Sequence, residues 1–233
     1  MRPQEKIRDT ETINTITGLL EQGVEKMSVI MRHSDRLFHK DSAMEPFMGL
    51  TEKGKDAAMQ LGSSLPAPPR KPRFFSSTFG RCIETAYLID KGFTKAHKIF
   101  NGHNVQAMEL APFYIINPPK AIAMVSETGN PVFLREWFDN KINESVMLNP
   151  EAAANRIAEF MTDQLKGLHS GEIAINVSHD WNLFPLKEFK LGLPHETFGM
   201  VGYLESVVIF ERGGKAHMTS YQMAEKGLET VCL

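Results

Sequence analysis

The stretch Ser28-Val29-Ile30-Met31-Arg32-His33-Ser34-Asp35-Arg36 decides how the rest of the chain is interpreted. Its first four residues form a short, mostly apolar run of the kind that builds a buried strand. The run then changes abruptly to two arginines, a histidine and an aspartate. Because ligands of open α/β sheets bind beyond the carboxyl ends of the strands, these side chains are placed to meet one. Two guanidiniums around one imidazole suit a dianion held against a nucleophile, and a phosphoryl group fits that description.

Further strands and helices are predicted on both sides of this stretch. Apolar spacing and end signals predict helices over 10–22, from Thr51 to Leu61, from Arg81 to near Gly92, and from Pro150 to Lys166. Strands are predicted at 73–76, 172–177, 204–210 and 215–221, the last two as a hairpin around Gly213-Gly214. The order of elements predicts an α/β protein: a three-layer α/β/α sandwich whose mostly parallel sheet carries an antiparallel edge strand.

The segment from Ile99 to Leu148 departs from this regular pattern. Its periodicity is poor, and asparagine, proline and scattered aromatic residues dominate it. A long stretch without clear elements is more often functional than idle. We therefore predict an inserted cap region over 99–148, within a single domain that spans 1–233. The amphipathic helix over 10–22 is expected to cover either a sheet edge or a homodimer interface.

The bulk composition excludes several classes of protein. With 42% hydrophobic and 23% charged residues, the chain is expected to be globular rather than disordered. A net charge of −2 gives no basic excess, so nucleic acid is not expected as a partner. The first nine residues lack the apolar core of a signal peptide, and no apolar run is long enough to span a bilayer. Two cysteines are too few for a disulfide framework, so we expect a cytoplasmic protein with no membrane partner.

Three polar clusters each follow a predicted strand, and together they resemble a known family. Arg32 to Arg36 resembles the Arg-His-Gly-x-Arg signature of the histidine phosphatase superfamily, and Leu50-Thr51-Glu52-Lys53-Gly54 is similar to its Leu-Thr-x-x-Gly segment. The stretch 76–86 looks like its second-arginine region, and Ser178-His179-Asp180 looks like its His-Asp motif. Arg36 and the His-Asp pair point to the acid-phosphatase branch, because the mutase branch would lack both features.

The resemblance implies a role for each of these residues. His33 would attack phosphorus and become phosphohistidine, and Asp180 would protonate the leaving alcohol. The phosphoryl oxygens would be held by four side chains: Arg32, Arg36, Arg81 and His179. The expected protein is a phosphomonoester hydrolase that acts on a small phosphorylated metabolite and needs no cofactor. Three arginines can offset the phosphoryl charge without a metal ion, and a neutral imidazole splits one displacement into two easier ones.

Several positions add to this expectation. Asp180 is ordinarily ionised at neutral pH but has to hold a proton, so the rate optimum is expected on the acid side. Glu109 is a second candidate for the proton donor and a substrate contact, because the mutase branch takes its acid from roughly this region. Ser34 and His39 are further candidates to contact the substrate. The family usually has glycine at position 34, so the loop after His33 is expected to differ or to be strained.

Three other functions stay open at this point. A phosphomutase on the same scaffold would have to shield its phosphohistidine from water. A phospho-ligand binding protein with little turnover is suggested by Ser34. A metal hydrolase would use His33, Asp35, His179 and Asp180, but the chain has no His-Glu-x-x-His or comparable spacing and the arginines would repel a cation. We therefore expect no metal ligands among these residues.

Overall fold

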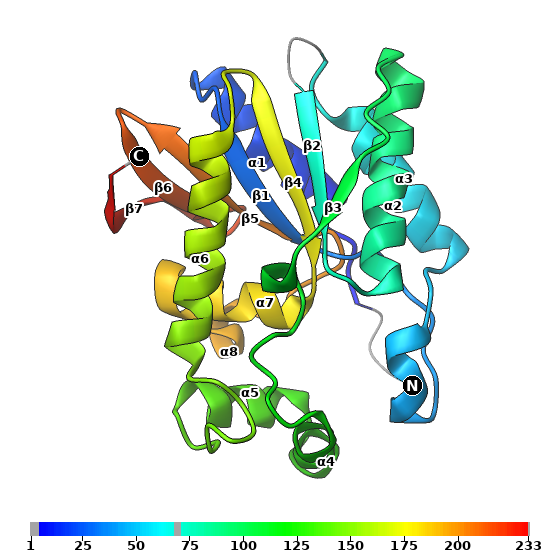
Figure 1. Cartoon of the computed structure of the whole chain (residues 1–233), viewed down its shortest axis with the longest axis vertical. Coiled ribbons are helices and arrows are strands. Elements are labelled where there is room, and N and C mark those ends of the chain that lie inside the picture. Colours follow the sequence, from blue (N-terminus) through cyan, green and yellow to red (C-terminus); the bar gives the residue numbers. More distant parts are fainter. Residues whose placement is uncertain (1–4, 68–70, 233) are drawn as a thin grey trace.

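The computed structural model describes residues 5–67 and 71–232, apart from the side chains of 42–43 and 229–232, and shows one sheet between two layers of helices (Figure 1). The strands are β1 (Met27–Arg32), β2 (Lys71–Ser76), β3 (Asn104–Gln106), β4 (Glu172–Ser178), β5 (Ser206–Arg212), β6 (Lys215–Ser220) and β7 (Met223–Cys232). The α-helices are α1 (Asp9–Glu21), α2 (Glu52–Ser64), α3 (Gly80–His97), α4 (Pro118–Thr128), α5 (Asn130–Phe138), α6 (Pro150–Gly167), α7 (Asp180–Pro185) and α8 (His195–Phe198). Shorter turns are the 3-10 helices η1 (Ser42–Phe47) and η2 (Met108–Leu110) and the π-helical η3 (Leu186–Leu191).

The sheet confirms the predicted fold class and extends its antiparallel side. The strand order is β3-β2-β4-β1-β5-β6-β7, in which β3, β2, β4 and β1 run parallel. The antiparallel part is wider than the predicted edge strand, because β5, β6 and β7 all pair antiparallel with their neighbours. The hairpin of β5 and β6 was expected, whereas β7 was not. Its polar sequence, Met223-Ala224-Glu225-Lys226-Gly227, lacks the apolar alternation that marks a strand.

Two helices begin directly after the capping residues that the sequence indicated, but one helix does not end at the glycine expected to stop it. Thr51 accepts a hydrogen bond from the backbone N–H of Gly54, and Asn149 caps α6 in the same way. The expectation that α3 ends near Gly92 was wrong, since the helix continues to His97. A Cβ at position 92 would lie 2.1 Å from the carbonyl oxygen of Met59. Gly92 therefore serves the close crossing of α2 and α3 rather than a helix stop.

The segment 99–148 contains more regular structure than its sequence indicated. Asn104–Gln106 forms β3 and pairs with β2 at the sheet edge, so this part belongs to the sheet. The remainder holds α4 and α5, which lie beyond the end of the sheet in Figure 1. Pro118 and Pro131 stand in the first turns of these helices, where proline is tolerated. The role of this segment as a cap stays a prediction.

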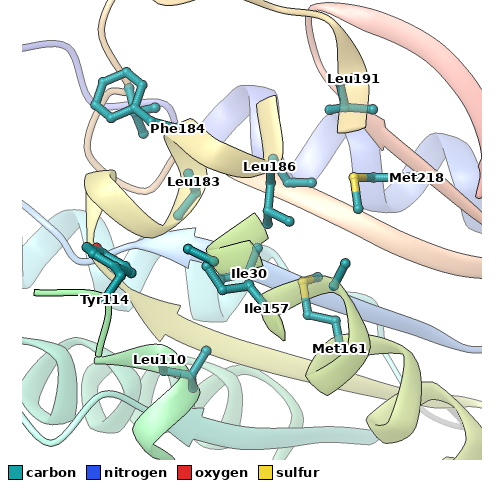
Figure 2. Close-up of a cluster of buried hydrophobic side chains, with 14 of the residues drawn as sticks. Ile30, Leu110, Tyr114, Ile157, Met161, Leu183, Phe184, Leu186, Leu191 and Met218 are labelled. Atoms are coloured by element: carbon teal, nitrogen blue, oxygen red, sulfur yellow. The ribbon is translucent and has the colours of Figure 1, made fainter. Parts of the chain in front are cut away.

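Two apolar clusters lie on opposite faces of the sheet because buried strand residues alternate between them. One packs α5, α6 and α7 against residues such as Ile30 and Ala174, and Figure 2 shows Ile157 of α6 and Leu186 of η3 next to Ile30. The other packs α1, α2 and α3 against Val29, Met31 and Ile175. Helix α1 thus covers a sheet face within its own chain and not a sheet edge. Among the described residues no helix combines the length and the apolar character needed to cross a membrane.

Candidate active site

The register of the sheet brings three strand ends together. Arg32 pairs with Ser178 across β1 and β4, and Ser76 pairs with Val177 across β2 and β4. The next residues along the chain therefore emerge side by side. They are His33, Ser77 and His179. This confirms that the three polar clusters predicted after separate strands share one edge of the sheet.

Arg32 is buried and is fixed by groups from distant parts of the chain. Its guanidinium donates to the carbonyl oxygen of Val201 at 2.7 Å and lies 4.1 Å from the ring centre of Tyr203. Carboxylate oxygens of Glu5 and Asp180 lie 2.7 Å and 3.2 Å from its nitrogens. Burial opposes the positive charge, but Asp180 and Glu5 outweigh it and raise the pKa of Arg32 above its usual value. The guanidinium is thus charged and held in one orientation.

His33 directs the lone pair of its Nε2 atom toward Arg81. Its Nδ1 lies 2.8 Å from the carbonyl oxygen of Ser34, and a carbonyl can only accept, so Nδ1 carries the proton. Nε2 then accepts a hydrogen bond from Nε of Arg81 at 3.0 Å. Burial, followed by the charges of Arg32 and Arg81, holds the pKa of His33 well below its usual range. The imidazole is therefore neutral, which is the nucleophilic form.

Arg81 joins the two histidines of the site. It stands in the first turn of α3, and its Nη2 donates to Nδ1 of His179 at 3.3 Å. His179 in turn donates from Nε2 to the hydroxyl of Ser77 at 3.0 Å. Burial and the charges of Arg81 and Arg32 lower the pKa of His179 well below its usual value. One guanidinium thus contacts two neutral imidazoles whose rings lie 5.6 Å apart.

Arg36 completes the group of cations at this edge. Its guanidinium pairs with the carboxylate of Glu45 in η1 and lies 4.2 Å from the ring centre of Phe38. Its charge is close enough to contribute to the lowered pKa values of Arg81, where burial is the larger cause, and of His179. Arg32, Arg36 and Arg81 therefore bring three positive charges to the same strand ends, as predicted.

The structure places Ser34 in the loop but turns its side chain away from the histidines. Its hydroxyl donates to the carbonyl oxygen of Gly54 at 2.7 Å, and its backbone N–H donates to Thr85. Ser34 is not among the described residues with positive φ. The strain expected from a side chain at this position is therefore absent. Gly54 makes the close approach instead, since a Cβ there would lie 2.1 Å from the carbonyl oxygen of Asp35.

The two candidate proton donors lie in different surroundings. Asp180 begins α7 and is about one-quarter exposed, with one carboxylate oxygen on Arg32 and the other accepting from the N–H of Trp181. Glu109 lies in η2, and its carboxylate pairs with Arg156 of α6 at 3.0 Å. Asp180 therefore contacts Arg32, whose charge acts on both histidines, whereas Glu109 is paired with a helix outside the site. His39 is exposed, and the ring contacts it makes are with the backbone of Asp41.

Four residues of the site were not predicted to belong to it. Glu5 and Tyr203 contact Arg32, Glu45 pairs with Arg36, and Ser77 orients His179. Glu5, Glu45 and Tyr203 carry no local sequence signal, because their contacts depend on long-range folding. The position of Ser77 in the sequence favours a helix-capping role instead. Cys82 is buried beside His179, and burial raises the pKa of its thiol to about 12, so it is not a nucleophile.

No protein-family model matches the chain, and no curated protein matches it in sequence. Its structure, however, resembles several solved ones. Bacillus stearothermophilus YhfR superposes with a TM-score of 0.55 and 21% identity, covering 84% of this chain and 96% of that one. The chain shares the fold of YhfR.

Two other solved structures share this fold with the chain. The phosphoglycerate mutase from Bacillus anthracis str. Sterne has a TM-score of 0.54 and 19% identity, over 85% of this chain and 94% of that one. Mycobacterial hydrolase 2 has a TM-score of 0.52 and 14% identity, over 82% of this chain and 85% of that one. At these identities the structures have only the fold in common, and the chemistry of this chain depends on the side chains at its strand ends.

Proposed function

We propose that the protein is a phosphomonoester hydrolase that works through a phosphohistidine at His33 on a small phosphorylated metabolite. The observation that carries the proposal is the Nε2 lone pair of His33, fixed by the bond from Nδ1 to the carbonyl oxygen of Ser34. Arg81 contacts this atom, the charge of Arg32 acts on the same ring, and Arg36 lies close enough to act on His179. Arginine suits the planar, bidentate binding of phosphate oxygens. A metal ion is not needed to offset the phosphoryl charge in this reaction.

The first chemical step transfers the phosphoryl group to the histidine. Nε2 of His33 attacks phosphorus while the bond from phosphorus to the ester oxygen breaks. Asp180 gives its proton to the departing oxygen, which leaves as an alcohol. Arg32, Arg81 and His179 donate hydrogen bonds to the phosphoryl oxygens, for which His179 has to turn a ring N–H toward the phosphate or take up a proton.

The second step returns the enzyme to its starting state. The Asp180 carboxylate takes a proton from water, and the oxygen of that water attacks phosphorus. The bond from phosphorus to nitrogen breaks, which frees inorganic phosphate and neutral His33. Because Asp180 must be protonated when the first step begins, we expect a rate optimum on the acid side of neutral. The low pKa of His33 keeps the nucleophile unprotonated under the same conditions.

The fold is shared with a phosphoglycerate mutase, so transfer to a second substrate is the nearest alternative function. Two features favour hydrolysis. The Asp180 carboxylate pairs with Arg32 within the site. Glu109, which a mutase would use as its proton donor, pairs instead with Arg156. The predicted cap over 99–148 would set which metabolite is accepted, and its two helices α4 and α5 supply the surface for that choice.

The test is a labelling experiment on the purified protein. A radiolabelled aryl phosphate is mixed with it, the reaction is stopped in alkali, and His33→Ala serves as the control. We expect label on the parent protein, none on the variant, and release of inorganic phosphate to water. Label that passes to an added alcohol and not to water would indicate a mutase. Absence of both label and phosphate release across a panel of phosphorylated metabolites would indicate a binding protein and overturn the proposal.

A further inference from the structure

A cluster of metal-ligand residues lies outside the strand-end site. Glu188 of η3 and His195 and Glu196 of α8 each offer one ligand atom, and these atoms lie within 4.8 Å of one another. It is the one such group among the residues that the structure describes. Helix α5 borders it through Pro131 and Arg135. Three segments therefore meet here, at the end of the molecule where Figure 1 shows α5 and α8.

His195 turns an unused lone pair into this cluster. Its side chain is only 3% exposed and packs edge-on against the rings of Phe138 and Phe184. Nε2 lies 3.2 Å from the carbonyl oxygen of Pro131, which can only accept, so Nε2 carries the proton. Nδ1 is then a bare nitrogen, and it is buried without a hydrogen-bond partner. A backbone carbonyl that fixes the second ring nitrogen is the usual setting of a metal-binding histidine.

Each glutamate of the cluster has one engaged oxygen and one that remains available. Arg135 contacts Oε1 of Glu188 at 3.0 Å and Oε1 of Glu196 at 3.5 Å. Oε2 of Glu188 is buried with no hydrogen-bond partner. Oε2 of Glu196 lies 3.4 Å from Nδ1 of His195. At this distance the lone pair of Nδ1 and the negative Glu196 oxygen repel each other unless a positive charge lies between them.

The charges around the cluster leave room for a divalent ion. Arg135 also pairs with Asp139 at 3.0 Å, and Asp139 pairs with Lys141 at 2.9 Å, so three carboxylates face two cations and the net charge is −1. One nitrogen and two oxygen ligands on a tetrahedral frame, with water in the fourth position, suit zinc. We propose that Glu188, His195 and Glu196 form a zinc site, in which Arg135 orients the two carboxylates from behind. Exposed Glu196 closes the site from the solvent side.

A zinc ion at this position would connect α5, η3 and α8, and two of these lead directly to Arg32. The chain beyond α8 supplies Val201 and Tyr203, both of which contact the Arg32 guanidinium. In η3, Lys187 forms a buried pair with Glu205 at 2.5 Å, and the Glu205 carbonyl accepts from the backbone of Arg32. None of the three ligand residues belongs to the strand-end site, so the expected effect of the ion is on stability rather than on the bond-breaking step. This inference does not depend on the proposed phosphatase activity.

The experiment measures zinc binding by the whole chain. Protein freed of metal by chelator dialysis is titrated with Zn²⁺ at pH 7.5 and followed by calorimetry and by thermal unfolding. We expect one equivalent to bind and the Tm to rise as zinc is added. Co²⁺ in place of Zn²⁺ should give the visible absorption of a tetrahedral site. Turnover below the Tm should persist in the metal-free protein.

Variants distinguish this site from other places where zinc could bind. Glu196→Gln should weaken zinc affinity by more than about tenfold, the lower end of the cost of losing even an outer-sphere partner. The Glu196 side chain is 45% exposed, so the fold tolerates the change, and Glu188→Gln provides a second test. Glu127→Gln on exposed α4 and His33→Gln at the strand ends should bind zinc like the parent.

Three results would overturn the proposal. The first is unchanged affinity in both Glu196→Gln and Glu188→Gln, which would place the ion elsewhere. The second is no binding at 100-fold excess of zinc over protein. The third is a nitrogen NMR spectrum of zinc-treated protein at pH 7.5 in which both ring nitrogens of His195 carry protons. In that last case an imidazolium, and not a metal ion, supplies the positive charge between His195 and Glu196.

Discussion

Acidification should destabilise the ligand-free protein through two specific imidazoles. His33 and His179 are buried and neutral in the folded state, and burial and the neighbouring arginines hold the pKa of each well below 6.5. In the unfolded chain both side chains take up protons as the pH falls through about 6.5. A group whose folded pKa is depressed in this way contributes stability above its unfolded pKa and loses it below. Each imidazole then costs up to about 1.4 kcal/mol of unfolding free energy per pH unit, and the pair up to about 2.7 kcal/mol.

The assay is urea unfolding followed by fluorescence of the two tryptophans, at half-unit steps from pH 7.5 to 5. The double variant His33→Gln/His179→Gln removes both titrating groups, and His169→Gln changes an exposed histidine as the matched control. We expect the parent and the His169 variant to lose stability together below pH 6.5. The double variant should lose less, by up to about 2.7 kcal/mol for each pH unit. Subtracting the unfolding free energy of the double variant from that of the parent at each pH removes the pH dependence that comes from carboxylates elsewhere in the protein.

Equal slopes for the parent and the double variant would refute this reasoning. Such a result would mean that the folded site accepts protons as readily as the unfolded chain. His33 would then take up a proton in the acid range, and the neutral nucleophile that the proposed first step requires would be lost. The stability measurement thus tests a requirement of the proposed mechanism without a substrate.

Three further predictions concern turnover and phosphate binding. Asp180→Asn should lower kcat on alkyl phosphates by about 10²- to 10⁴-fold but barely affect activated aryl phosphates, since only the poor leaving group needs a proton. Arg81→Lys should lower kcat/KM by about 10²- to 10³-fold, because a lysine keeps the charge but cannot contact both histidines as the guanidinium does. Glu5→Gln should tighten inhibition by inorganic phosphate about two- to fivefold, since it removes a partly exposed carboxylate that competes for Arg32.

Each of these outcomes has a control and a contrary result. Equal losses on alkyl and aryl phosphates would count against Asp180 as the acid, and Glu109→Gln would then be the next variant to measure. If Arg81→Lys kept the kcat/KM of the parent, a positive charge at position 81 would be enough for turnover, and the forked shape of the guanidinium would not matter. Weaker phosphate inhibition in Glu5→Gln would mean that Glu5 orients Arg32 for the ligand. Glu11→Gln is the matched acidic control, since Glu11 is a half-buried glutamate of the same terminal segment that pairs with Arg8 and not with Arg32.

The sequence by itself determined three of the four parallel strands, β1, β2 and β4, and the residues at their ends. Apolar runs that stop at Arg32, at Ser76 and at Ser178 are local signals, and the open-sheet rule places the next residues of the chain at one edge. The capping residues Thr51 and Asn149 were equally local, because a cap depends on residues within one turn. These features could be predicted since each rests on neighbours in the chain.

Only the tertiary structure decided the features that depend on residues far apart in the chain. Gly92 looked like a helix stop until the crossing with Met59 showed what it accommodates. Glu5 and Tyr203 reach Arg32 from opposite ends of the chain, and Ser34 turns toward Gly54 because α2 begins beside it. Side-chain direction and charge pairing across such separations have no periodic signature in a sequence. Even at His33 only the contact of Nδ1 with the carbonyl oxygen of Ser34 is local, whereas the contact of Nε2 with Arg81 depends on how α3 packs against the strand ends.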